Sequence, residues 1–138
     1  NQEEVLGESS IAVRGGETVL VVEDEEAIRT LVRFALEGLG YKVVTASCGM
    51  DALKWVLAHP NSLDLLVTDV IMPGFSGREL AEKARKACIG LRVLFMSGYT
   101  DDALDRHGLQ GTSDQFIQKP FTPLALASKV RAILDRSD

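Results

Sequence analysis

The stretch of sequence that decides the fold is LLVTDVIMPGFSG, residues 65–77. It starts as an apolar run of the kind found in strands covered on both faces, and the run ends on a single acid, Asp69. Pro73, Gly74 and Gly77 then predict that the chain turns away. A carboxylate at the end of a buried strand indicates that the ends of the neighbouring strands also carry functional groups.

Short apolar runs rich in β-branched residues alternate with segments of helical period along the chain. Strands are predicted at 18–22, 42–46, 63–69, 92–96 and 115–118. The first, third and fourth runs are apolar almost throughout, which indicates central strands of a parallel sheet between two layers of helices.

Between the strands, apolar residues recur at steps of three and four. The clearest stripe lies within residues 28–39, a shorter one within 53–57, and the weakest helical pattern within 100–111.

Two further helices have distinct start signals. Ser76 followed by Glu79 predicts a capping box, and Thr122 followed by Pro123 predicts the start of the last helix. Five repeats of strand then helix predict an α/β fold, (βα)5, with a five-stranded, doubly wound parallel sheet.

The composition is that of one globular domain. The 138 residues are 46% hydrophobic and 25% charged, and no apolar run approaches the roughly 20 residues that a membrane-spanning helix requires. The net charge of −5 has the wrong sign for holding nucleic acid through its phosphates. Residues 1–17 read as a polar linker before one domain over 18–138. With no signal-peptide pattern, we expect a cytoplasmic location and no membrane contact.

The predicted strand ends carry a set of residues with complementary chemistry. Glu23 and Asp24 follow the first strand, Asp69 ends the third, Ser97 follows the fourth and Lys119 follows the fifth. Ligands of doubly wound sheets bind at this carboxyl edge. Crowded carboxylates and open oxygen ligands suit Mg²⁺, which in turn suits phosphate. Asp69 is then a candidate carboxylate nucleophile for a phosphoryl group, assisted by Lys119 and Ser97.

Each signal also has a simpler explanation. A strand-end acid such as Asp69 is often a turn residue or a helix cap, and acids at 23–26 are favoured in the first turn of a helix by its dipole. Their placement at four strand ends of one sheet edge favours the functional interpretation.

Four motifs, VLVVEDEE, LLVTDVIMPGFSG, LFMSGYTDDAL and FIQKPF, resemble those of the receiver domain of bacterial response regulators, which has a flavodoxin-like fold. The resemblance covers residues 18 to about 136. It implies that Asp69 is the phospho-acceptor and that Asp24 ligates Mg²⁺ directly. It also implies that Glu23 completes the acidic pocket, through water, and that the backbone carbonyl of Ile71 is a further metal ligand.

The resemblance also implies roles beyond the metal. Ser97 and Lys119 would contact the phosphoryl group, Ser97 and Phe116 would form the switch, and the Lys119–Pro120 peptide would be cis. The two bulky residues at 71 and 99, Ile71 and Tyr99, would tune the phosphoryl lifetime by covering the site. The domain would then catalyse its own phosphorylation and dephosphorylation.

Family likeness also implies the partners. The phosphoryl donor would be a histidine kinase or a histidine phosphotransfer domain, and phosphorylation would remodel the fourth helix, fifth strand and fifth helix, a possible dimer face. MSGYTDDAL and QKPFTP look most like a receiver at the C-terminal end of a hybrid sensor histidine kinase. The chain agrees, because it starts as a linker and stops after the last helix. The parent chain would then be a histidine kinase.

Alternatives are a stand-alone single-domain regulator and a pseudo-receiver that serves as a protein-binding module. A phosphatase of the haloacid dehalogenase type would need a second Asp where Ile71 stands. A dinucleotide-binding domain would need a glycine-rich first loop in place of EDEE.

Overall fold

The computed structural model describes residues 16–72, 74–98 and 115–135, and the predicted helix within 100–111 therefore lies outside the described residues. The elements follow in the order β1 (Thr18–Val22), α2 (Glu26–Glu37), β2 (Lys42–Ala46), α3 (Gly49–Ala58), β3 (Leu65–Asp69), α4 (Gly77–Ala87), β4 (Arg92–Ser97), β5 (Gln115–Gln118) and α6 (Pro123–Leu134). All strand pairs are parallel, in the order β2-β1-β3-β4-β5. The predicted five-stranded parallel sheet is confirmed.

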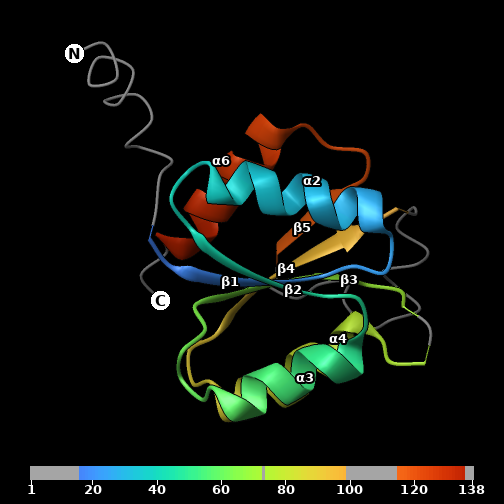
Figure 1. The fold of residues 1–138 in the computed structure, drawn as a ribbon, viewed down its shortest axis with the longest axis vertical. Helices are drawn as coiled ribbons and strands as arrows, with labels where there is room; N and C mark the ends of the chain where they lie inside the picture. Colours follow the sequence, from blue (N-terminus) through green and yellow to red (C-terminus); the bar gives the residue numbers. More distant parts are fainter. Residues whose placement is uncertain (1–15, 73, 99–114, 136–138) are drawn as a thin grey trace.

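Helices cover both faces of the sheet. In Figure 1, α2 and α6 lie side by side on one face, and α3 and α4 lie on the other. Each face has its own core: Leu20, Leu66 and Phe95 point toward α3 and α4, whereas the neighbouring Val21, Val67 and Leu94 point toward α2 and α6. Alternate residues of one strand thus serve opposite cores, which is why these strands are apolar at nearly every position.

The three runs predicted to be central are central. β1, β3 and β4 occupy the middle of the sheet, and every residue of β3 is buried, including Asp69 at its end. Full burial of a Val, Leu or Phe side chain stabilises a fold by roughly 1.5–3 kcal/mol. This burial stabilises the central strands and therefore the positions of the residues at their ends.

Two strand boundaries differ from the prediction. β3 begins at Leu65 rather than at residue 63, because its pairing with β1 begins at Val19 and Leu65. Asp64, just before the strand, accepts a hydrogen bond from the backbone N–H of Thr18 on its carboxylate at 2.9 Å. β4 extends to Ser97, which is therefore the last residue of the strand rather than the first one after it.

The predicted helix starts are confirmed. Ser76 Oγ accepts a hydrogen bond from the backbone N–H of Glu79, and the Glu79 carboxylate accepts one from the backbone N–H of Ser76. Thr122 Oγ1 accepts a bond from the N–H of Ala125, with Pro123 in the first helical position. Caps of this kind contribute about 1 kcal/mol each. They fix where α4 and α6 begin.

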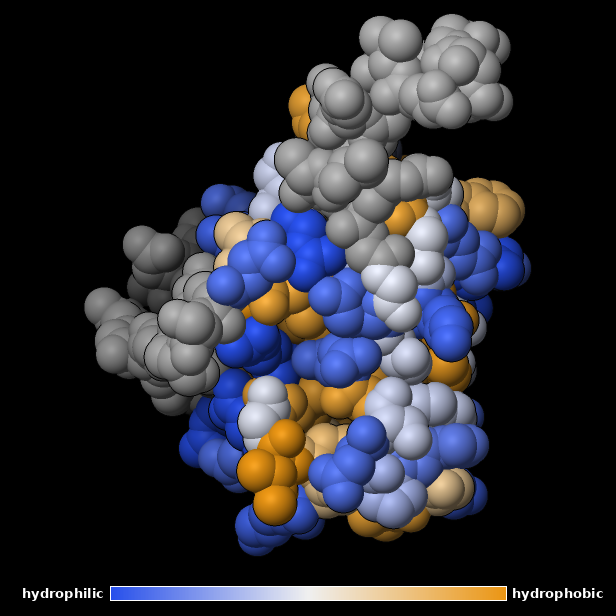
Figure 2. All heavy atoms as spheres, turned by 90° about the vertical axis from the view of Figure 1, so that its left-hand side faces the viewer, coloured by the Kyte–Doolittle hydropathy of each residue, from blue (hydrophilic) through white to orange (hydrophobic). Residues whose placement is uncertain are grey.

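A charged cluster ties the first strand to the last helix at the opposite edge from the strand ends. The Arg131 guanidinium donates to the Glu17 carboxylate at 2.8 Å, to the Tyr41 hydroxyl at 3.2 Å and to the Asp135 carboxylate at 2.8 Å. Figure 2 looks onto this side of the molecule and shows mainly hydrophilic side chains with hydrophobic ones scattered between them. Across the described residues, no helix has the length and apolar character needed to cross a membrane.

Candidate functional site

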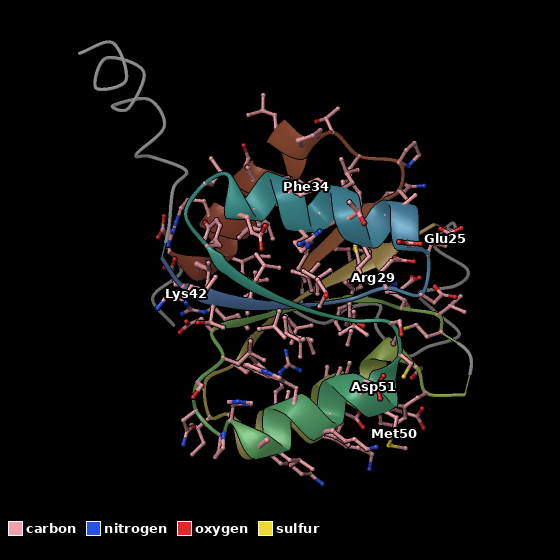
Figure 3. The ribbon with its side chains drawn as sticks, viewed as in Figure 1. Glu25, Arg29, Phe34, Lys42, Met50 and Asp51 are labelled. Carbon is pink, nitrogen blue, oxygen red and sulfur yellow. The ribbon has the colours of Figure 1, made fainter. Side chains whose placement is uncertain are left out.

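The carboxyl ends of the strands bring the predicted site residues to one edge of the sheet. Val22 pairs with Thr68 in the ladder between β1 and β3, so the next residue, Glu23, lies level with Asp69. In Figure 3, Glu25 and Arg29, which follow β1, lie toward the side of the molecule where the strands end. Lys42, which begins β2, lies on the opposite side.

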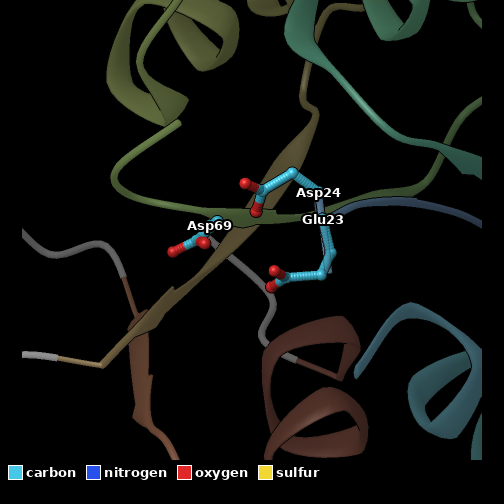
Figure 4. Close-up of side chains that lie close together, drawn as sticks. All are labelled: Glu23, Asp24 and Asp69. Carbon is cyan, nitrogen blue, oxygen red and sulfur yellow. The ribbon is translucent and has the colours of Figure 1, made fainter. Parts of the chain in front are cut away.

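Three acids form a compact cluster. One carboxylate oxygen from each of Glu23, Asp24 and Asp69 lies within 4.8 Å of the other two. Figure 4 shows the three side chains lying close together. Glu23 and Asp69 are buried, with 0% and 8% of their surface exposed, whereas Asp24 is exposed. Two buried acids beside an exposed one need positive charge nearby, because like charges so close oppose ionisation.

Lys119 supplies positive charge to both buried acids. Its Nζ lies 2.8 Å from Glu23 Oε1 and 3.1 Å from Asp69 Oδ2. The ammonium reaches the cluster from the turn after β5, whose Lys119–Pro120 peptide is cis, as expected. Burial opposes the charge of Lys119, but the hydrogen bond to Glu23 and the charge of Asp69 outweigh it and raise the pKa of Lys119.

Glu23 is anchored at several points. Its Oε2 accepts a hydrogen bond from the backbone N–H of Glu25 at 3.1 Å, and its backbone carbonyl accepts one from Arg29 Nη1 at 2.8 Å. Burial raises the pKa of Glu23, and the Lys119 ammonium opposes that rise. Oε1 has this ion pair but no well-aligned hydrogen bond.

The pKa of Asp69 is subject to the same opposing effects as that of Glu23. Burial raises the pKa of Asp69, while Lys119 and the backbone N–H of Ile71 lower it and the charge of Asp24 raises it further. A buried carboxylate kept ionisable by a neighbouring ammonium is suited to act as a nucleophile.

The donor set fits a hard divalent cation. Carboxylate oxygens from three residues converge, and Glu23 Oε1 is a buried oxygen whose hydrogen-bonding capacity is not fully used. Such oxygen-rich sites suit Mg²⁺, which binds through a few carboxylates and keeps open positions.

The acceptor strand is held in place by a close backbone approach. The N–H of Gly77, the first residue of α4, donates to the Val70 carbonyl at 3.0 Å. A Cβ at Gly77 would lie only 2.1 Å from the Asp69 carbonyl oxygen, so no larger residue fits without a shift of the backbone. Gly77 therefore lets α4 begin directly against the acceptor.

An open cleft lies beside the cluster and is lined by Asp24, Glu25, Asp69, Ile71, Met72, Gly98 and Lys119. Ile71, one of the two predicted tuning residues, forms part of its wall and is 36% exposed. The other tuning residue, Tyr99, lies outside the described residues.

The two predicted switch residues lie on neighbouring strands. Ser97 ends β4, is 5% exposed, and accepts a hydrogen bond from the N–H of Lys119 through its carbonyl at 2.8 Å. Phe116, on β5, is half-buried and stacks on Phe95 of β4, with 5.6 Å between ring centroids. β5 is the last strand in the sheet order.

Sequence reasoning missed Arg29. Its guanidinium fixes the carbonyl of Glu23 from the first turns of α2. The available signal was a basic residue six positions after Glu23, one helical turn into the element that follows the acids. This spacing alone does not say that the side chain folds back on the strand end.

Comparison with known proteins shows the family of the chain. Residues 19–131 match the response regulator receiver domain family. The sensor kinase CckA of Brucella abortus is 35% identical over 95% of this chain and 14% of its own length. The regulator PhoP of Bacillus subtilis, named for alkaline phosphatase synthesis, is 38% identical over 87% of this chain and 49% of its own length. The chain thus spans half or less of both relatives.

Solved structures give the same answer. The receiver domain of a hybrid histidine kinase CckA is 36% identical, with a TM-score of 0.74 over 86% of this chain and 99% of its own. The receiver domain of a sensor histidine kinase of Pseudomonas aeruginosa, 20% identical, has a TM-score of 0.77 over 88% of this chain and 100% of its own, and was crystallised with a magnesium ion in its active-site cleft. With its five-stranded flavodoxin-like fold and a relative in a hybrid kinase, this chain belongs to the response regulator receiver domain family of two-component signalling.

Proposed function

We propose that this domain accepts a phosphoryl group on Asp69 in a phosphorelay. Receiver domains interact with histidine kinases or phosphotransfer partners, so the donor would be a phosphohistidine on such a protein. The observation that carries the proposal is the placement of Asp69, buried at the end of a central strand, 3.1 Å from the Lys119 ammonium and within a cluster of acids.

The residues of this chain account for the chemistry. A carboxylate oxygen of Asp69 attacks the phosphorus atom, a P–O bond forms while the P–N bond to the histidine breaks, and the imidazole nitrogen keeps the electron pair of that bond. Lys119 holds Asp69 in its charged, nucleophilic form and then faces the added negative charge. Ser97 would donate a hydrogen bond to a phosphoryl oxygen.

Glu23, Asp24 and Asp69 and the backbone carbonyl of Ile71 would hold Mg²⁺. When bound, the ion neutralises charge on the transferring phosphoryl oxygens. The acid cluster and the magnesium in the cleft of the Pseudomonas aeruginosa receiver support this assignment.

The proposed switch couples the site to an edge of the sheet. Movement of Ser97 toward the phosphoryl group would let Phe116 turn inward, which changes the surface of β5, α6 and the segment before β5. Because Phe116 is half-buried on the last strand of the sheet, its ring has both core and surface positions within reach. Phosphorylation then biases a two-state element. Dimerisation would use the same face.

The donor would dock on the layer formed by α2 and α6. This layer exposes three large apolar side chains, Leu31 (40%), Phe34 (61%) and Leu124 (72%), the first two on the helix that follows the acids. Exposed apolar groups on helices that follow strands of the site suit a protein partner better than a small molecule.

The wider setting is also part of the proposal. Residues 1–17 would be a linker and 18–138 the receiver, in the cytoplasm and attached to a hybrid histidine kinase. The similarity to the sensor kinase CckA supports attachment to a kinase. The similarity to PhoP supports the alternative that the domain belongs to a regulator separate from the kinase. A single-domain regulator is the other alternative.

The proposal is tested by incubating the protein with Mg²⁺ and acetyl phosphate and measuring its intact mass. We expect the mass of one added phosphoryl group, absent in Asp69→Asn and absent when a chelator removes Mg²⁺. A pseudo-receiver would remain unmodified although folded.

A further inference from the structure

The acceptor loop is the segment that follows Asp69, with 70–72 and 74–76 as its described residues. Its Ile71 and Met72 line the cleft, and the segment is fixed at both ends. At its start, the Val70 N–H donates to the Met96 carbonyl at 3.0 Å. At its end, Ser76 caps α4. Between these points the described residues offer two apolar anchors. One is Met72, which is buried in the core.

The second anchor is Phe75, which packs against Gly49. Phe75 is half-buried, and Gly49, the first residue of α3, is buried. A Cβ at Gly49 would lie 2.2 Å from Cδ2 of the Phe75 ring and 3.0 Å from its Cγ. The ring therefore occupies the space that any side chain at Gly49 would need.

This contact joins two segments that lie far apart in the sequence. Gly49 begins the helix after β2, and Phe75 lies six residues after Asp69. Met50 and Asp51, in the first turn of α3, lie on the same side of the molecule as Glu25 (Figure 3). The start of α3 thus lies beside the acceptor loop.

We propose that Phe75 is a positioning residue for phosphoryl transfer. Its ring packs against Gly49 and thereby keeps Ile71 and Met72 in their places on the cleft wall beside Asp69. The inference rests on the proposed acceptor function of Asp69. It adds that the start of α3 sets the geometry of the acceptor loop.

The effect of Gly49→Ala distinguishes a positioning role of this contact from simple packing. Alanine at the start of a helix is ordinarily better than glycine. Gly49→Ala should therefore do harm only through the displaced ring of Phe75. Misplacement of a reacting group by about 1 Å can cost on the order of 100-fold in rate. Gly49→Ala should therefore change Mg²⁺ binding and the rate of phosphorylation of Asp69, and not only the stability of the domain.

The test uses Gly49→Ala, Phe75→Leu and the double variant, with Gly16→Ala as control because nothing lies within 4 Å of a Cβ there. For each protein we would measure the melting temperature, the Kd for Mg²⁺, and kcat and KM for phosphorylation by acetyl phosphate, below the onset of unfolding.

We expect Gly49→Ala to weaken Mg²⁺ binding and lower kcat by about tenfold, within the range of coupling between touching residues. Phe75→Leu should weaken Mg²⁺ binding and lower kcat by about threefold, through the same kind of coupling. In the double variant the smaller leucine side chain leaves room for the methyl group added at position 49, so its values should return to those of Phe75→Leu alone. Gly16→Ala should match the wild type.

Two outcomes separate the possible failures. If Gly49→Ala lowers only the melting temperature, or if the two substitutions are additive, the contact is packing and the positioning role is wrong. If the wild type binds no Mg²⁺ and takes no phosphoryl group, the proposed function itself is wrong.

Discussion

The ammonium of Lys119 lies 3.1 Å from the carboxylate of Asp69, although 50 positions separate them in the chain. The same ammonium lies 2.8 Å from Glu23, which is fully buried. One cation therefore balances two carboxylates whose burial opposes ionisation. If the site binds Mg²⁺ as proposed, the ammonium would compete with the ion for the same oxygens.

Lys119→Met should destabilise the domain and make its stability depend more on Mg²⁺. Removing one partner of a buried ion pair leaves unpaired charge, and we expect a loss of roughly 2–3 kcal/mol without metal, less than for a fully buried pair because Lys119 is partly accessible. Mg²⁺ should recover more of this loss than it adds to the wild type, through linkage to binding.

Urea unfolding with and without Mg²⁺ measures both effects. Lys86→Met, an exposed position on α4, is the matched control. Equal stabilisation of the wild type and Lys119→Met by Mg²⁺ would show that Lys119 does not compete with the metal.

Ile71→Asn should shorten the lifetime of the phosphorylated domain. Ile71 is an apolar part of the cleft wall, and a polar side chain there would admit and orient water. We expect loss of phosphate about tenfold faster, equivalent to ~1.4 kcal/mol in the barrier. Following the phosphorylated fraction by intact mass measures this loss. Ile89→Asn, 90% exposed at the opposite edge, is the control, and unchanged or slower loss in Ile71→Asn would refute the tuning role.

Phe34→Ala should impair transfer from a protein donor but not from a small one. Only a minority of interface residues cost more than about 1 kcal/mol on truncation, and large side chains at the centre of a docking surface are the best candidates; if Phe34 is one of them, its loss should weaken binding by about fivefold. Rates of transfer from a phosphorylated kinase or phosphotransfer domain and from acetyl phosphate separate the two cases. Leu57→Ala, equally exposed on α3, is the control. Equal losses in both variants would place the docking surface elsewhere.

The contact between Glu17 and Arg131 should make stability depend on pH in acid. The Arg131 guanidinium, hydrogen-bonded at 2.8 and 3.3 Å, holds the pKa of Glu17 below its ordinary value of 4.5. A lowered folded-state pKa stabilises fully above the unfolded-state value and loses that contribution as pH falls through the folded-state value.

Glu17→Gln should therefore reduce the free energy of unfolding by about 1 kcal/mol at neutral pH and by less below pH 4.5. Denaturant unfolding across this range checks it, with the exposed Glu37→Gln as control. A deficit of the same size at about pH 3 would mean that the pair acts through packing, not charge.

Much of the fold was predictable because it depends on local patterns. Apolar runs placed β1, β3 and β4 in the middle of the sheet, and the Ser76 and Thr122 caps gave two helix starts to the residue. The start of β3 was missed by two residues because the pairing with β1 begins at Val19 and Leu65, and pairing between distant segments is contained in no local pattern.

The site divides in the same way. Strand ends brought Glu23, Asp24 and Asp69 together as predicted, because parallel strands align their carboxyl ends. The Phe75 ring against Gly49 could not be predicted, because it depends on how the acceptor loop and the start of α3 pack in space.

The proposed role of Asp69 is tested most directly by finding which residue carries the phosphoryl group. After phosphorylation by acetyl phosphate with Mg²⁺, borohydride reduces an aspartyl phosphate to homoserine, and peptide mass spectrometry locates the changed residue. We expect homoserine at position 69 alone and none in Asp69→Asn. Conversion at another residue, or a phosphoryl group that persists in Asp69→Asn, would contradict this role.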